Sequence, residues 1–167
     1  TYQVTLKLFR DCHSTGAQLD PVVPFTVFRK EQTGVVFFQS YDVTMTRRDE
    51  LRLRSPGECI NNPPVVCYEV GVYIFTLKLP STPFGYTVSF QRCCRIENMT
   101  NVIGSGQVGS TYTADIPGTN VLADAPKNSS PTLAVKDTVI VCEDNYFTYD
   151  FGAVDNEKDS LSYSFGA

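Results

Sequence analysis

The alternation of apolar and polar side chains along this chain predicts β-strands and not helices. Between Thr1 and Leu8 every second residue is apolar, and strand-like patterns return in the segments 22–30, 35–41, 68–79, 86–95 and 110–116. Successive side chains on a strand point to opposite faces of a sheet, so this pattern supplies one apolar face for a core. Apolar residues at helical spacing are not found in any window of about 11 residues. The chain is therefore predicted to be all-β.

Turn residues suggest how these strands pair. The turn Glu31–Gly34 predicts a hairpin between its two flanking strands, and Pro80–Gly85 predicts another hairpin between 68–79 and 86–95. We expect the strands to form an antiparallel β-sandwich of the immunoglobulin-like type.

A change in composition predicts a boundary between two units. Residues from Pro117 to Pro131 are rich in Gly, Asn, Asp, Pro and Ser. We expect a disulfide-stapled sandwich over residues 1–126 and a partial second unit, of immunoglobulin or cadherin type, over residues 127–167. The second unit is too short for a complete sandwich of about 100 residues. Its expected strands are 132–142, 146–151 and 160–165.

Six cysteines and a single histidine constrain the chemistry. One histidine disfavours a mixed cysteine/histidine zinc site, and the cysteine spacings lack the close pairs of an all-cysteine zinc site. An even number of cysteines in a β-rich chain favours disulfides formed in an oxidising, extracellular compartment. On an extended strand the adjacent Cys93 and Cys94 would point to opposite faces, so a bond between them is not expected.

Sequence proximity and strand faces suggest three disulfides. Cys59 and Cys67 lie at the two ends of a polar loop, and they are close enough in sequence for a disulfide to close that loop. Cys12 and Cys94 both follow strands on the apolar face, and Cys93 would then reach the second unit. The expected pairs are Cys59–Cys67, Cys12–Cys94 and Cys93–Cys142.

Charge and hydropathy exclude several classes of partner. The net charge is −4 and no run of basic residues is present, which argues against binding of nucleic acid. Arg47, Arg48, Arg52 and Arg54 form the one basic concentration, which we interpret as a solvated strand face. Apolar runs stay well short of the roughly 18 residues of a membrane span.

The sequence gives no catalytic constellation, and we expect a protein that is not an enzyme. His13 is the one available imidazole base, and it lies in a loop next to Cys12. The glycines at 104, 106 and 109 match G-x-G-x-x-G, but they do not join an apolar parallel strand to a helix.

An acidic segment near the C-terminus offers a candidate cation site. Asp155, Glu157 and Asp159 alternate within AVDNEKD, which resembles the A-x-D-x-D/E motif of cadherin-like repeats. In that family such acids bind Ca²⁺ between successive domains, since the ion prefers about six to eight oxygen ligands. Because Lys158 interrupts the acids, a solvated acidic turn is the alternative interpretation.

A wider resemblance covers nearly the whole chain. Its motifs are, in order, Leu8-Phe-Arg-Asp-Cys12, Cys67-Tyr68, Arg92-Cys-Cys-Arg95, Asn128-Ser-Ser-Pro131 and Asp159-Ser-Leu-Ser-Tyr163. They resemble the large secreted, multidomain surface proteins of Bacteroidota. These are gliding-motility-associated proteins with PKD or cadherin-like repeats, exported by the type IX system.

The resemblance implies an extracellular module that acts in adhesion or as a structural spacer. Its expected partners are neighbouring domains of the same chain, together with a surface glycan or another surface protein. Proteins exported in that phylum are also glycosylated on Asp-Ser/Thr-aliphatic sequences, a pattern that Thr138 and Ser160 fit. Ordinary strand residues are the alternative interpretation of these two short matches.

Two other functions remain open. The chain could be a carbohydrate-binding module of a secreted polysaccharide-degrading enzyme, with Tyr41, Tyr73 or Tyr112 as stacking platforms, although it lacks tryptophan. It could also be a subunit of a surface filament, in which the incomplete second unit pairs its open edge with a neighbour.

Overall fold

The computed structural model describes residues 1–52, 65–95, 97, 99, 102–134 and 144–164. It confirms the all-β prediction, since the described residues include nine strands and two short 3₁₀ turns. The strands are β1 (Tyr2–Asp11), β2 (Val22–Glu31), β3 (Gly34–Thr44), β4 (Arg47–Arg52), β5 (Cys67–Leu77), β6 (Gly85–Arg92), β7 (Ser110–Pro117), β8 (Thr132–Leu133) and β9 (Ala153–Val154). The 3₁₀ turns are η1 (Ser105–Gln107) and η2 (Ala125–Lys127).

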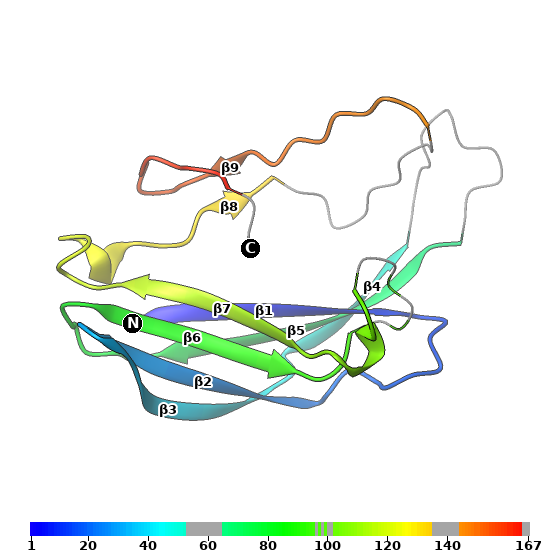
Figure 1. The fold of residues 1–167 in the computed structure, drawn as a ribbon, viewed down its shortest axis with the longest axis horizontal. Helices are drawn as coiled ribbons and strands as arrows, with labels where there is room; N and C mark the ends of the chain where they lie inside the picture. The colour runs from blue at the N-terminus through cyan, green and yellow to red at the C-terminus, as the bar shows by residue number, and fades with distance from the viewer. Residues whose placement is uncertain (53–64, 96, 98, 100–101, 135–143, 165–167) are drawn as a thin grey trace.

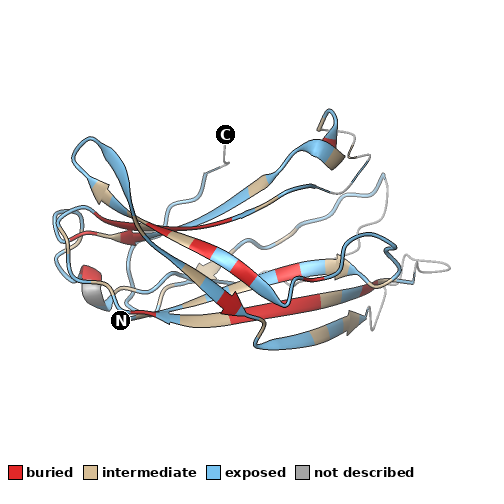
Figure 2. Cartoon of the chain, turned by 90° about the horizontal axis from the view of Figure 1, so that it is seen from below, coloured by how far each residue is buried: buried red, intermediate tan, exposed pale blue. Residues whose placement is uncertain are grey.

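Two antiparallel sheets face each other as a β-sandwich (Figure 1). Sheet A has the order β1-β5-β4, and sheet B has the order β3-β2-β6-β7. The short strands β8 and β9 pair with each other in a separate two-stranded sheet. Buried residues concentrate on the strand faces that lie between the two layers (Figure 2).

The core joins alternate residues of both sheets. On sheet B, Phe25 lies on the inward face of β2, and its ring contacts Phe75 of sheet A at a centroid distance of 4.6 Å. The ring of Phe90 lies 5.7 Å from Phe25 on the neighbouring strand. Each large apolar side chain buried in this way stabilises the fold by about 1.5–3 kcal/mol. The fully assembled cluster comprises Leu8, Leu19, Val23, Phe25, Val27, Val43, Tyr73, Leu77, Tyr86, Val88, Phe90 and Ile116.

The local predictions for the first strands are confirmed. The apolar residues that alternate along β1 pack on the core, while the residues between them are exposed. Strands β2 and β3 form the predicted hairpin, in which Glu31 faces Gly34 across the turn. Gly34 has a φ of 109°, which lies in the left-handed region that favours glycine at this turn.

The predicted hairpin between segments 68–79 and 86–95 is wrong. Strand β5 pairs with β1 and β4, whereas β6 pairs with β2 and β7. The connection between them crosses from one sheet to the other, and the Tyr86 hydroxyl donates a hydrogen bond of 3.0 Å to the Pro80 carbonyl inside this crossing. Both strands bring large side chains to the same core from opposite sides. Alternation therefore predicted the two strands correctly but could not indicate their partners.

The chain that follows β7 packs back on the sandwich before it continues to β8. The amide of Thr119 donates to the Thr82 carbonyl at 3.0 Å, and the Tyr2 hydroxyl donates to the Ala125 carbonyl at 3.1 Å. Ala125 is almost completely buried. These contacts attach residues 119–125 to the first unit, and the division between residues 126 and 127 stays a prediction.

The second unit contains little regular structure in its described part. Strands β8 and β9 pair over two residues each. The predicted strands at 146–151 and 160–164 are not formed, and residues 135–143 and 165–167 lie outside the described residues. Among the residues described, no helix is long and apolar enough to cross a membrane.

Candidate functional site: the cysteine end of the sandwich

Four of the six cysteines, Cys12, Cys67, Cys93 and Cys94, lie with a dense group of charges at one end of the sandwich, which we call the cysteine end. Strand β1 ends there at Asp11, β5 begins at Cys67 and β6 ends at Arg92. The loop 12–21 leads from β1 in sheet A to β2 in sheet B, so the ends of both sheets meet at this point. Two disulfides and several ion pairs lie within this region.

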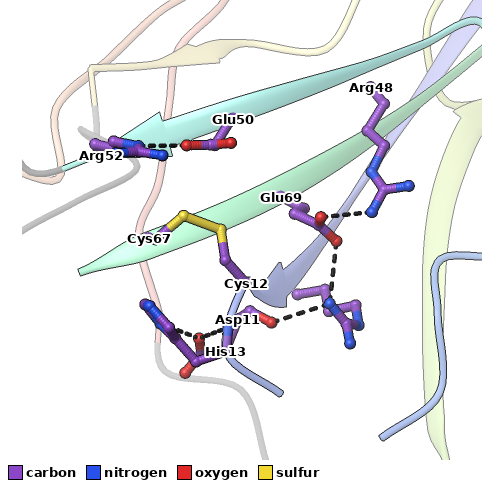
Figure 3. Close-up of a disulfide and its surroundings, with 9 residues drawn as sticks. Asp11, Cys12, His13, Arg48, Glu50, Arg52, Cys67 and Glu69 are labelled. Carbon is purple, nitrogen blue, oxygen red and sulfur yellow. Dashed lines mark hydrogen bonds and ion pairs between the residues drawn. A yellow bond between two sulfur atoms is a disulfide. The ribbon is translucent and has the colours of Figure 1, made fainter. Parts of the chain in front are cut away.

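A disulfide joins Cys12, which follows the last residue of β1, to Cys67, the first residue of the neighbouring strand β5 (Figure 3). Their Cα atoms are 5.4 Å apart, and the Cys12 amide donates to the Cys67 carbonyl at 3.1 Å. The bond therefore extends the β1–β5 ladder by one covalent step beyond Asp11. The predicted pairs Cys59–Cys67 and Cys12–Cys94 are wrong, because the sequence did not indicate that β1 and β5 are neighbours; Cys59 itself lies outside the described residues.

The second disulfide links the adjacent residues Cys93 and Cys94, whose Cα atoms are 3.3 Å apart. This corrects the expectation that the two side chains point apart. That expectation requires an extended backbone, but β6 ends at Arg92 and the chain bends at Cys93. The predicted pair Cys93–Cys142 is wrong for the same reason, and Cys142 lies outside the described residues.

Glu69 is the centre of an ion-pair network beside the Cys12–Cys67 disulfide (Figure 3). Its carboxylate lies 3.1 Å from Arg10 of β1 and 2.5 Å from Arg48 of β4. The hydrogen bond from Arg48 lowers the pKa of Glu69, desolvation partly opposes this, and the charge of Arg48 and the contact with Arg10 add to the lowering. The network joins all three strands of sheet A.

Two arginines fasten the loop 12–21 to the sandwich from opposite sheets. Arg10 of sheet A, whose side chain is only 9% exposed, donates to the Ala17 carbonyl at 3.0 Å and also to the Ser14 carbonyl. Arg92 of sheet B donates to the Gln18 carbonyl at 3.2 Å and pairs with Asp20 at 3.3 Å. This leaves the loop held along most of its length.

The sequence did not predict that Arg10, Glu69 and Arg92 form the ion pairs of the cysteine end. The positions of the two arginines along their strands were part of the evidence for it. Arg10 lies on the same inward face of β1 as Leu6 and Leu8, and Arg92 lies on the same inward face of β6 as Phe90. A charged residue on the apolar face of a strand is expected to find a partner where the strand leaves the core.

The described arginines of the predicted basic concentration, Arg47, Arg48 and Arg52, are paired with carboxylates. Arg47 lies 2.8 Å from Asp49, and Arg52 contacts Glu50. With Arg48 bound to Glu69, each of these arginines has a carboxylate partner, as expected for a solvated strand face. Arg54 lies outside the described residues.

The cysteine end does not assemble a nucleophile or a metal centre from its described residues. The His13 ring lies 3.3 Å from Asp11, but the neighbouring Cys12 is bonded and cannot supply a thiolate. Ligand atoms of Cys12, Glu50 and Cys67 lie within 4.8 Å of one another. Both sulfur atoms belong to the disulfide, so this group lacks the thiolates that a soft metal ion requires.

The candidate calcium ligands have protein partners instead. The Asp155 carboxylate accepts from the Asp159 amide at 3.0 Å, and the Glu157 carboxylate accepts from the Ser129 hydroxyl at 2.7 Å. Within the described part of the chain, Asp155, Glu157 and Asp159 do not converge as a group of three ligands. The geometry is that of an acidic turn whose Glu157 reaches back to Ser129. Ser129 lies in the segment 117–131 between the two units, which we call the linker.

Scans against models of known protein families find no match, and searches of the curated proteins and of the solved structures find none either. The resemblance to Bacteroidota surface proteins therefore stays a prediction from the sequence.

Two of the three candidate sugar platforms are unavailable. Tyr73 is completely buried and donates to the Asp20 carbonyl at 2.6 Å, while Tyr41 packs against Phe75 at the core. Tyr112 is 53% exposed and stacks on Phe90 at 6.1 Å. Of the candidate glycosylation residues, Ser160 is exposed and Thr138 lies outside the described residues.

A cavity of about 40 Å³ lies at the end of the sandwich opposite the cysteines. It is lined by Tyr2, Tyr86 and Ala125, among others. A volume of this size can hold a water molecule but is far below the roughly 300 Å³ of a typical ligand pocket.

Proposed function

We propose that this protein is a non-enzymatic, extracellular β-sandwich module of a large bacterial surface protein, acting in adhesion or as a structural spacer. The observation that carries the proposal is the cysteine end. There the Cys12–Cys67 disulfide and the network around Glu69 fasten the strands of sheet A together. Disulfides of this kind persist in oxidising compartments and stabilise proteins outside the cell.

The charges at the cysteine end support a structural role. Arg10, Arg48 and Arg92 each contact a carboxylate or a carbonyl of the same chain. Catalytic sites instead aim polar groups at a substrate position within a cleft. Ion pairs that are satisfied within the chain therefore suit a structural role better than a catalytic one.

The linker supports a place in a tandem array. The Glu157 carboxylate contacts Ser129 at the start of the segment that leads into β8. This contact restrains the linker relative to the turn after β9. Restrained linkers keep neighbouring modules in a preferred orientation, which suits a multidomain surface protein.

Surface labelling tests the location. Intact cells of the source organism are treated with a membrane-impermeant amine reagent, and the labelled proteins are identified by mass spectrometry. We expect peptides of this chain in the labelled fraction of intact cells. Labelling that appears only after lysis would contradict an extracellular module.

A bead assay tests the adhesive role. Beads carrying the folded protein are allowed to settle on surfaces coated with bacterial glycans or with outer-surface protein extracts, and bound beads are counted under flow. Retention above that of heat-unfolded protein supports adhesion. Retention equal to that control on every surface would leave the spacer role as the supported one.

A second candidate, a filament subunit, is favoured by one observation. The second unit exposes Tyr146 by 93%, Phe151 by 63% and Tyr163 by 62%. Strands from a neighbouring chain could cover these aromatic side chains and extend the short β8–β9 sheet. Concentration-dependent assembly in analytical ultracentrifugation, with filaments in electron microscopy, supports this function; a monomer at all concentrations excludes it.

The carbohydrate-binding alternative keeps Tyr112 as its one exposed platform among the three predicted. A glycan array on wild-type protein and on Tyr112→Ala tests it. Micromolar binding that the substitution abolishes would favour this function over adhesion to a protein partner.

A further inference from the structure

We propose that the Cys93–Cys94 disulfide is a thiol–disulfide exchange site for an external dithiol, whereas Cys12–Cys67 is a structural bridge. This goes beyond the structural function proposed above, because it gives the module a reactive group on its surface. The bond between these adjacent cysteines closes a small ring that contains no other residue. The place of this ring in the chain, its exposure and the contacts on both sides of it indicate the role.

The Cys93–Cys94 bond does little to stabilise the fold. A disulfide stabilises mainly by restricting the unfolded chain, and the effect grows with the number of residues that it encloses. Cys12 and Cys67 are 55 positions apart in the sequence, whereas Cys93 and Cys94 are adjacent. A ring that encloses no further residues removes almost no freedom from the unfolded chain. Its presence therefore calls for a role other than stability.

Exposure distinguishes the two disulfides as targets for a reagent. Cys93 and Cys94 are both exposed, immediately after the end of β6. Cys67 is only 8% exposed, and Cys12 is partly buried. Because an attacking thiolate must reach a sulfur atom in line with the bond, exposed disulfides exchange more readily than buried ones.

The backbone on both sides of the ring is held independently of the ring. Arg92 pairs with Asp20 through its side chain. Arg95 donates its amide to the Val108 carbonyl at 2.9 Å and its Nε to the Gly109 carbonyl at 3.2 Å. Opening the disulfide would therefore release two side chains without releasing β6 or β7.

The exchange balances as a two-electron transfer from the dithiol to the protein. A thiolate of the dithiol attacks one Sγ, the Sγ–Sγ bond breaks, and the other cysteine leaves as a thiolate that takes up a proton. The second thiol of the reagent then attacks the mixed disulfide. The products are the Cys93 and Cys94 thiols and the cyclic disulfide of the reagent.

The test uses the intact wild-type protein with dithiothreitol as the dithiol. Samples are equilibrated at graded ratios of reduced to oxidised reagent, then alkylated and mapped by mass spectrometry, while far-ultraviolet circular dichroism follows the fold. We expect Cys93 and Cys94 to become alkylated at a ratio at least about tenfold lower than Cys12 and Cys67, with an unchanged spectrum. Alkylation of all four cysteines at the same ratio, or of Cys93 and Cys94 only with loss of the spectrum, would overturn the proposal.

The double variant Cys93→Ser/Cys94→Ser is the matched control. It should lose the early alkylation and keep the late alkylation of Cys12 and Cys67 at the wild-type ratio. A shift of that late alkylation by tenfold or more would show that the two disulfides are coupled, which contradicts separate roles. The wild-type map alone distinguishes the two outcomes, even if this variant does not fold.

Discussion

The sandwich and the β8–β9 unit have similar strand-like sequences but differ sharply in what their apolar residues contact. In the sandwich, Phe25 and Tyr73 are buried between two sheets. In the second unit, Tyr146 and Phe151 are largely exposed, and β8 and β9 pair over only two residues each. A lone two-stranded pair is marginal in water, because its apolar face has no second layer to cover it. The comparison shows that alternation makes a strand possible and that the opposing sheet makes it stable.

The two regions also differ in how they are fastened. The sandwich has a disulfide across β1 and β5 and an ion-pair network around Glu69. The described part of the second unit is joined to the linker by the hydrogen bonds between Glu157 and Ser129. We therefore expect substitutions to have large effects in the first region and small ones in the second.

The largest expected effect comes from the aromatic contact between the sheets. Phe25→Ala removes a ring that is 3% exposed and contacts Phe75 and Phe90. The free energy of unfolding should fall by about 4 kcal/mol, since the lost burial is combined with a cavity. Urea unfolding followed by circular dichroism measures this. The matched change Phe151→Ala in the second unit should cost less than about 0.5 kcal/mol, and equal losses would refute the contrast between the regions.

Removal of the cross-strand disulfide ranks next. The double variant Cys12→Ala/Cys67→Ala should lose about 3 kcal/mol, because its unfolded chain is no longer closed across 55 positions. The same urea experiment on Cys93→Ser/Cys94→Ser should give a loss several times smaller. If the adjacent pair proved equally stabilising, the division into a structural and an exchangeable disulfide would fail.

Acid should weaken the sandwich through Glu69. Its pKa is lowered in the folded protein, so its contribution is complete above the ordinary glutamate pKa and is lost as the pH falls through the lowered value. Glu69→Gln should therefore destabilise the protein at neutral pH and flatten its stability between about pH 5 and pH 3. Unfolding midpoints across this range test the sign. An unchanged slope in Glu69→Gln would contradict the assignment.

The smallest effect is expected at the linker. Glu157→Gln weakens the hydrogen bond from Ser129 and should change global stability by less than about 0.5 kcal/mol, because both groups are exposed. Its effect should appear locally, as faster hydrogen exchange of the Ser129 amide. Asp159→Asn, which retains the Glu157 contact, serves as the comparison. Equal exchange in both variants would argue that Glu157 does not restrain the linker.

Local pattern and turn chemistry made part of this fold predictable. The alternation in β1 and the turn before Gly34 led to the correct strand and the correct hairpin. The sheet membership of β5 and β6 was not predictable, since a seven-residue connection can return within one sheet or cross to the other. The contacts that decide between these lie far apart in sequence, as in the pairing of Tyr2 with Leu77.

The cysteine end was harder to predict for the same reason. The even cysteine number correctly indicated disulfides, yet the partner of Cys12 depends on the order of strands in sheet A. The face argument for Cys93 and Cys94 failed because β6 ends one residue before them. A face rule is reliable only while the backbone remains extended, and the end of a strand is the least predictable point of the pattern.

The positions of Tyr2 and Pro117 have a mechanical consequence. The first residues of β1 and the chain that leaves β7 meet at the end opposite the cysteines, where the Tyr2 hydroxyl contacts Ala125. Tension applied between Thr1 and the linker would thus peel β1 from β5 one pair at a time, starting at Tyr2 and Leu77. Peeling must stop at the Cys12–Cys67 bond, after a release of roughly 35–40 Å of extended chain. The disulfide would act as a stop that fixes the length by which β1 can be drawn out under load.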